Sequence, residues 1–492
     1  MNRILVVWLL AIPAALMAQG PDTVWTRHYG GIGDEICRAM RPTQGGGFVL
    51  AGSTTSEGSG GTDAYVVVTA ADGTPLWSAH YGGSLDDEFC GVLPLPSSDF
   101  LFAGTTHSYG GSGGDFWLFK TSAQGDSLWS HTYGVTGDQT CSSLEATSDG
   151  GYMLSGVTCS SPGANTDIFL VKTDAWGNAA WTRTIGDTTS EQIARVIALP
   201  QGNYMLAGSE DVWHGPQAGT EAYALKVNAM GNPTWQHLFE ETLPAHGTAV
   251  QQAPGGGYIF SATADQYSHG EAGLYKESML MRMTPSGVEE WESLCGLPYD
   301  DELNDVAVTP DGAFLGAGAR QLPEESKDGF VVKVADGVNS GDTAWTRTWG
   351  GGNDDGFTSV AVLDGGRCAL AGTTHSHGNG EDADFWLVMM DSVYALSASG
   401  LPKALPEDFS VSACPNPFNG STWIQFHLPR DGRITLRLYD AEGRAAALLA
   451  DGSFARGAHA IHFHGESLAS GLYFCRLASS TGTRTAKVVL LK

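Results

Sequence analysis

Aspartate occurs at one fixed position of a repeated pattern in this sequence, and its carboxylates could bind a metal ion. In five repeats an Asp stands nine residues after a Trp, and in three of these a second Asp follows directly. The eight residues are Asp34, Asp86, Asp87, Asp138, Asp300, Asp301, Asp354 and Asp355. Because Ca²⁺ takes about six to eight oxygen ligands, a ring of such carboxylates could hold this ion. No other cofactor is expected.

The alternative role for these aspartates is structural. An Asp in a turn commonly accepts backbone N–H bonds, which would fix the start of the following strand. Ser190 and Pro244 replace the Asp in two repeats, and no Asp-x-Asp-x-Asp-Gly loop occurs. The turn-forming interpretation is therefore the simpler one, and Ca²⁺ binding is kept as a hypothesis.

Two further patterns were weighed as reactive sites. His375 and His377 lie in an acid-rich segment that could bind a transition metal, but the segment offers no third firm ligand. The stretch Gly110–Gly114 formally matches Gly-x-Ser-x-Gly but lacks the strand–turn–helix context of a nucleophile elbow. The sequence therefore predicts no catalytic residue.

The elements that must position these residues come from an internal repeat. Tryptophan recurs at steps of 52 to 56 residues, and a small residue, usually Gly, follows each Trp by 27 residues. The tryptophans are Trp25, Trp77, Trp129, Trp181, Trp235, Trp291 and Trp345. Each unit contains four short strand-like runs separated by Gly, Ser and Asp turns. Four strands in each of seven repeats predict an all-β fold, a seven-bladed β-propeller.

The two ends of the repeat region predict how the ring closes. The region begins with a lone Trp-containing strand at residues 23–29, and its last unit stops after a third strand at residues 384–389. We expect the N-terminal strand to complete the last blade, which would remove the exposed sheet edges of an open array.

One face of this propeller is predicted to be acidic and variable. The loop between the second and third strands varies most in length, and it shares a face with the acidic connections between blades. Binding commonly resides in loops carried by a rigid scaffold.

Composition and charge exclude several classes of partner. The chain of 492 residues contains 54 acidic and 26 basic residues, a net charge of −28. Nucleic acids and anionic membrane surfaces require clustered positive charge, so neither is expected as a partner. Residues 1–18 have the charged and apolar regions of a secretory signal peptide, and no later apolar run is long enough to span a membrane.

A second domain follows the repeats. The period ends after Asp391, so we assign residues 21–391 to the propeller, 392–408 to a linker and 409–492 to a β-rich module. The stretches CPNPFNGSTWIQFHLP and SLASGLYFCRL and the terminal Lys resemble the type A sorting domain of type IX secretion substrates. The matching positions are Pro415, Asn416, Pro417, Phe418, Asn419, Gly471, Tyr473 and Lys492. The resemblance implies a small immunoglobulin-like β-sandwich that is bound by the type IX secretion machinery.

The expected function is binding outside the cell. The repeats look like the secreted propeller repeats often joined to that sorting domain. We expect an exported cell-surface or secreted scaffold that binds a glycan or protein ligand without catalysis. The alternative is a secreted glycoside hydrolase or lyase that uses carboxylates on the loop-variable face. An active site needs unique convergent residues, and the conspicuous acids here repeat around the ring.

Overall fold

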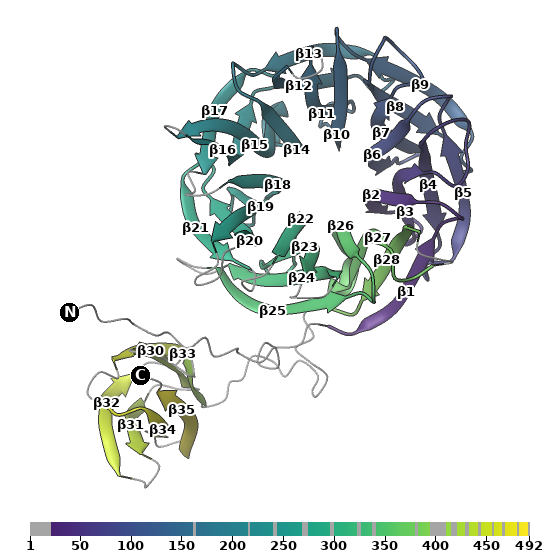
Figure 1. Ribbon diagram of the computed structural model, residues 1–492. Helices are drawn as coiled ribbons and strands as arrows, with labels where there is room; N and C mark the ends of the chain where they lie inside the picture. The colour runs from purple at the N-terminus through teal and green to yellow at the C-terminus, as the bar shows by residue number, and fades with distance from the viewer. Residues whose placement is uncertain are drawn as a thin grey trace, which may run out of the picture. The chain divides into compact units, whose positions relative to one another are not determined.

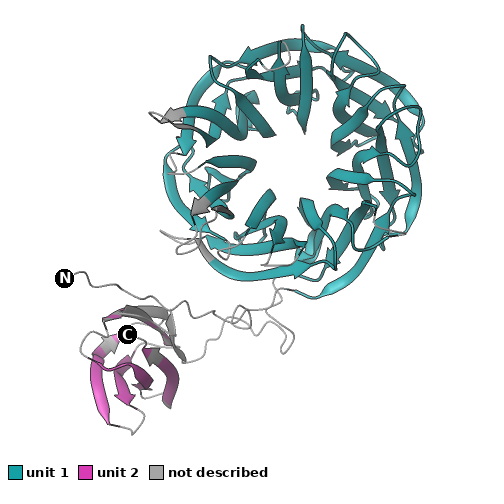
Figure 2. Cartoon of the chain, in the orientation of Figure 1, with its two compact units in different colours: residues 1–397 teal, residues 398–492 magenta. Residues whose placement is uncertain are grey.

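The computed structural model describes two compact units, residues 1–397 and 398–492 (Figure 2). The described residues are 21–160, 164–214, 217–239, 244–267, 274–295, 300–321, 326–336, 341–378, 382–393, 410–414, 421–428, 432–440, 444–454, 457–464, 468–479 and 482–490. The predicted signal peptide and residues 394–408 of the predicted linker lie outside them. No helix in the described residues is long and apolar enough to cross a membrane.

The described part of the first unit forms seven four-stranded antiparallel sheets, arranged as the blades of a propeller (Figure 1). The inner strands are β2 (Glu35–Pro42), β6 (Asp87–Pro94), β10 (Asp138–Ala146), β14 (Glu191–Ala198), β18 (Ala245–Gln252), β22 (Asp300–Val308) and β26 (Asp355–Val362). The second strands are β3 (Phe48–Thr54), β7 (Phe100–Thr106), β11 (Tyr152–Cys159), β15 (Tyr204–His214), β19 (Tyr258–Tyr267), β23 (Phe314–Gln321) and β27 (Cys368–Thr374). The all-β propeller prediction is confirmed.

The outer half of each blade contains two further strands. The third strands are β4 (Asp63–Thr69), β8 (Asp115–Thr121), β12 (Thr166–Thr173), β16 (Gln217–Val227), β20 (Leu274–Met283), β24 (Lys327–Asp336) and β28 (Asp384–Met390). The outer strands are β1 (Thr23–Tyr29), β5 (Pro75–Tyr81), β9 (Ser127–Tyr133), β13 (Ala179–Ile185), β17 (Pro233–Phe239), β21 (Glu289–Leu294) and β25 (Gly341–Trp349). Two 3₁₀ turns, η2 (Pro200–Gly202) and η3 (Asp364–Gly366), stand between first and second strands.

The ring is closed by β1, which is the outer strand of the last blade. The sheet order β1-β28-β27-β26 places the first strand of the chain beside one of the last strands of the repeat region, with Tyr29 opposite Phe385. This pairing gives the last blade its fourth strand and removes a free edge from β28. The propeller continues slightly beyond the predicted boundary, since Val393 is buried and its N–H donates to the Gly366 carbonyl.

Neighbouring blades are joined by the repeated tryptophan and a glycine turn. Gly73, in the turn before β5, has a φ of +77°, and a Cβ at this position would lie 2.8 Å from the Trp25 ring. Gly125 lies against Trp77 in the same way, at a φ of +92°. A side chain at these turns would be strained and would displace the indole ring, so the pattern requires glycine. The Nε1–H of Trp77 also donates to the Ala123 carbonyl of the next blade at 3.0 Å.

The second unit consists of two antiparallel sheets around one core. One sheet contains β29 (Ser410–Cys414), β30 (Ser421–Leu428) and β33 (Gly457–His464). The other contains β32 (Ala445–Phe454), β31 (Gly432–Asp440), β34 (Gly471–Ser479) and β35 (Gly482–Leu490). Ile424 of the first sheet and Leu436 and Leu477 of the second are fully buried in the shared core. Two sheets that share one apolar core have the arrangement of a β-sandwich.

Deletion of residues 21–30 from the mature chain should lower the melting temperature by at least about 10 °C. The deletion exposes the edge of β28 and removes Tyr29 and Trp25 from the core formed with Phe48 and Phe385. Differential scanning calorimetry measures the shift, and Val24→Ser, a change at an exposed position of β1, is the control. An unchanged melting temperature in the deletion would contradict ring closure by β1.

Candidate functional site

Every inner strand carries a β-bulge whose extra residue faces the central channel. The register between first and second strands shifts at the same point in all seven blades, for example between Cys37 and Ala39 in the first. The seven bulged residues are Arg38, Cys90, Ser142, Ala194, Thr248, Asn304 and Thr358. All seven line one cavity of about 220 Å³. A β-bulge changes the direction in which a side chain points. Here the seven bulged side chains together line one cavity.

Charged side chains from four blades lie deeper along the inner strands. A second cavity of about 380 Å³ is lined by Arg41, Glu145, Arg195, Gln251 and Asp305, among others. Nη2 of Arg195 donates to Oδ1 of Asp305 at 2.8 Å, an ion pair that joins the fourth and sixth blades. Oδ2 of buried Asp305 also accepts the N–H of Val360 at 3.0 Å. Asp305 is therefore held by partners from the fourth and seventh blades.

The remaining charges of the channel are less completely paired. Burial lowers the pKa of Arg41, and the nearby positive charge of Arg195 lowers it further. Burial raises the pKa of Glu145, which Arg41 and Arg195 only partly oppose. Arg38 is half exposed and approaches Glu88 only to 3.7 Å. The two linings contain three guanidinium and two carboxylate groups, in a chain whose net charge is −28.

Cysteines also lie along the inner strands. Cys37 and Cys141 are buried, but Cys90 is half-buried and lines the channel because it is a bulged residue. All three are free thiols, as are Cys295, Cys368 and Cys475. Burial raises the pKa of the Cys37 thiol to about 12.

The five aspartates that follow Trp by nine residues lie on the loop-variable face and bond to the preceding blade. Oδ1 of Asp86 accepts the N–H of Thr62 at 2.8 Å, and Oδ1 of Asp34 accepts that of Ala383 at 3.0 Å. Asp138, Asp300 and Asp354 accept in the same way from Gly114, Lys276 and Lys327. Each acceptor lies in the connection to an inner strand or is the first residue of that strand, and each donor lies just before or near the start of a third strand. The bonds therefore link successive blades, whereas the sequence analysis expected bonds within a single turn.

The next residue along the chain is a buried polar group in six of the seven blades. Asp87 accepts the Gly83 N–H at 2.8 Å and the hydroxyl of Thr106, and Asp355 accepts from Gly351 and Thr374. Asp301 instead forms a bidentate pair with Arg320, at 2.6 and 3.0 Å. Glu35, Gln139 and Glu191 occupy this position in the other blades and were not identified from the sequence. Each of them stands ten residues after a Trp, and this spacing could have identified them. It was missed because the residue type at this position changes from blade to blade.

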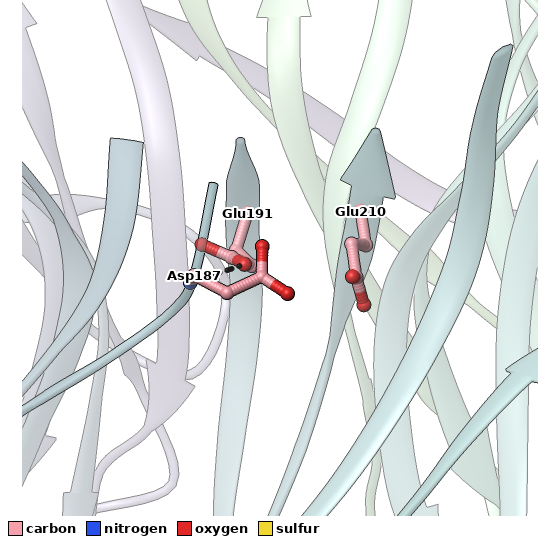
Figure 3. A group of neighbouring side chains, drawn as sticks. All are labelled: Asp187, Glu191 and Glu210. Atoms are coloured by element: carbon pink, nitrogen blue, oxygen red, sulfur yellow. Dashed lines mark hydrogen bonds between the residues drawn. The ribbon is translucent and has the colours of Figure 1, made fainter. Parts of the chain in front are cut away.

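The fourth blade departs from this pattern. Glu191 pairs in register with Glu210, and Asp187 lies beside them, so that one carboxylate oxygen from each lies within 4.8 Å of the others (Figure 3). Burial raises the pKa of Glu191 to about 7, with further contributions from Glu210, Asp167 and Asp187. Burial likewise raises the pKa of Glu210, and the charge of Asp187 adds to this. Like charges are thus concentrated at one blade.

The structure does not bring the eight predicted metal-site residues together. Across the described residues, three acids close enough to share an ion occur at Asp187, Glu191 and Glu210, and none of the eight belongs to this group. Each of the eight carboxylates instead accepts from neighbouring backbone or side-chain donors. Ca²⁺ binding at those eight residues stays a prediction.

The predicted sorting motif is only partly within the described residues. Pro415, Asn416, Pro417, Phe418, Asn419 and Lys492 lie outside them. Gly471 begins β34, and Tyr473 is buried in the sandwich core, with its hydroxyl donating to the Ala469 carbonyl at 2.8 Å.

Known proteins resemble the two units in different ways. No curated protein matches the chain. PorZ, a surface component of the type IX secretion system of Porphyromonas gingivalis, is 12% identical with a TM-score of 0.42, and the match covers 94% of this chain and 60% of PorZ. Drosophila Semaphorin 2a is 7% identical with a TM-score of 0.47, covering 96% and 99% of the two chains. Sqt1 from Chaetomium thermophilum is 10% identical with a TM-score of 0.44, covering 76% and 99%.

The C-terminal unit has a match at the level of sequence. Residues 412–491 match the family of secretion system C-terminal sorting domains. The resemblance of this segment to a type IX sorting domain is therefore confirmed. The protein carries a type IX sorting domain and is exported to the cell surface or the extracellular space.

Proposed function

We propose that the exported propeller is a non-enzymatic binding scaffold whose central channel holds a carboxylate-bearing group of an extracellular glycan or protein. The observation that carries this proposal is the ring of bulged residues, which gathers one side chain from each of the seven blades into one lining. Arg38 is accessible there, and Arg41 and Arg195 line both cavities. Guanidinium groups bind carboxylates through paired, charge-assisted hydrogen bonds, so an acidic ligand fits this lining.

The channel is favoured over the acidic face because it breaks the seven-fold repetition. The bulge ring differs in every blade except for the two threonines, and the charges below it come from single blades. On the loop-variable face, by contrast, the repeated aspartates accept backbone N–H bonds from the preceding blade. Carboxylates engaged in this way are poor candidates for contact with a ligand.

The enzymatic alternative would need a pair of accessible carboxylates. Glu191, with a pKa raised to about 7, has the acidity of a general acid and has Glu210 as a neighbour. Its side chain, however, is almost fully buried, and neither acid lines the two channel cavities. Asp305 is fixed by Arg195 and by backbone N–H groups. These features support binding rather than hydrolysis.

Filling the channel should abolish binding. Ala194→Trp places an indole in the bulge ring and should weaken the affinity for an acidic ligand by at least tenfold, whereas Ala179→Trp on the exposed edge of the third blade should not. Ligands are identified with the mature chain on arrays of uronic-acid, sialic-acid and neutral glycans and of acidic peptides, and affinities are then measured by calorimetry. Binding that survives in Ala194→Trp, or turnover of the bound ligand, would contradict the proposal.

Removal of residues 409–492 should retain the propeller in the periplasm of the native host. The deletion removes the segment that the type IX machinery binds and leaves the contacts of the first unit intact. Cell fractionation followed by surface immunolabelling locates the product, and the full-length chain is the control. Surface display of the shortened chain at normal levels would refute the role of this segment in export.

A further inference from the structure

The blades satisfy the hydrogen bonds of the buried polar group at the start of the inner strand in different ways. In the first, second, third and seventh blades, the residue opposite in register is a threonine whose hydroxyl bonds to that group. These threonines are Thr54, Thr106, Thr158 and Thr374. The sixth blade uses Arg320, and the fifth has alanine at both positions, Ala245 and Ala264. The buried group thus accepts from a hydroxyl or from Arg320 in four blades, donates its own amide N–H to Thr158 in the third, and is absent from the fifth.

In the fourth blade the donor is replaced by a second acid. Glu210 stands at the threonine position, directly opposite Glu191, and cannot donate when ionised. Asp187 adds a third carboxylate at a position that is Gly31, Gly83 and Gly351 in other blades. Figure 3 shows Glu191 and Asp187 turned toward each other, with Glu210 facing them from the next strand.

The protein offers few donors to these carboxylates. The N–H of Asp187 reaches Glu191 Oε1 at 3.3 Å, and the N–H of Thr189 reaches Asp187 Oδ1 at 2.8 Å. The Thr189 hydroxyl has one hydrogen, and its Oγ1 lies 2.7 Å from Asp187 Oδ1 but 3.4 Å from Glu191 Oε1 and from Glu210 Oε1. The other oxygen of Glu191, Oε2, is buried and has no hydrogen-bond partner, in a residue that is only 4% exposed. A buried charged oxygen without a partner is costly, so this side chain calls for a ligand that the protein itself does not provide.

We propose that Asp187, Glu191 and Glu210 bind one Ca²⁺ ion at the start of the fourth blade. The donors are all oxygens, which hard divalent cations prefer. Ca²⁺–oxygen distances of about 2.3–2.6 Å let one ion contact oxygens about 5 Å apart, whereas Mg²⁺ at about 2.1 Å spans only about 4 Å. The oxygens here all lie within 4.8 Å of one another, inside the span that one Ca²⁺ ion allows.

The bound ion would have a structural consequence for this blade. Asp187 lies in the connection from the third blade, Glu191 begins β14, and Glu210 belongs to β15. The strands β15 and β16 pair from Tyr204 to His214, well past Glu210, and form a longer hairpin than β7 and β8 of the second blade. The cation would therefore anchor the base of this hairpin to the junction with the preceding blade.

The test compares the mature chain with a variant that restores the pattern of the other blades. Wild-type protein should bind one Ca²⁺ in calorimetry, and its melting temperature should rise by about 5 °C at a hundredfold excess over Kd. Glu210→Thr installs the threonine found in four blades, so it should weaken Ca²⁺ binding at least tenfold and melt higher than wild type in chelator. Glu57→Thr, the same change at a side chain that is 79% exposed, should behave like wild type.

The melts are run in Ca²⁺, Mg²⁺ and chelator at matched ionic strength, because salt screening alone would raise the stability of a chain with this net charge. Equal melting temperatures in Ca²⁺ and chelator would overturn the proposal. So would a Ca²⁺ response retained by Glu210→Thr but lost in Asp86→Asn, which would place the ion at the repeated aspartates. A higher melting temperature of Glu210→Thr without Ca²⁺ binding by wild type would show that protons, not a cation, relieve the repulsion.

Discussion

The packing of an outer-strand tryptophan against a glycine turn of the next blade, which the described residues show for Trp25, Trp77, Trp129, Trp181 and Trp235, is the contact on which the rest of this structure depends. A four-stranded sheet cannot bury both of its faces alone, so each blade is stable only through its two junctions. At the closing junction, Trp25 of β1 packs against Gly73 and Phe48 of the first blade, as Trp77 packs against Gly125 and Phe100 one blade later. The closing strand therefore reproduces the same junction as the others and leaves no blade with an unpaired face.

A polar layer on the loop-variable face completes these junctions. One carboxylate, such as Asp86, bonds to a backbone N–H of the preceding blade, and the next, such as Asp87, is buried and bonded within its own blade. Buried charge is tolerated only when donors surround it, because an unsatisfied carboxylate loses its hydration without compensation. The acidity of this face thus follows from assembly of the ring. The repeated aspartates of this face therefore have a structural role in joining the blades.

The sequence was sufficient to predict the blades and the closing strand, because both follow from the spacing of tryptophan and glycine and from the strand-like runs between them. The residues that line the channel and those of the acidic group were harder to predict, because their positions depend on the register between neighbouring strands. Arg38 and Asn304 reach the channel only because a bulge shifts the inner strand by one residue. The repeated small residue was in fact its signature: a Cβ at Gly52 would lie 1.9 Å from the Ile36 carbonyl oxygen, beside the bulge. Glu210 resembled an ordinary strand residue, since its partner Glu191 is identified only once that register is known.

Deviations from the repeat therefore indicate where this scaffold has acquired specific chemistry. Two such deviations meet on one strand, because Glu191 begins β14 and Arg195 lies four residues later at the channel. Arg195 crosses to Asp305 in the sixth blade, so its position depends on how firmly β14 is held. A cation at Glu191 would fix the start of that strand at the junction with the third blade. The channel lining and the acidic group of the fourth blade are then connected through the single strand β14.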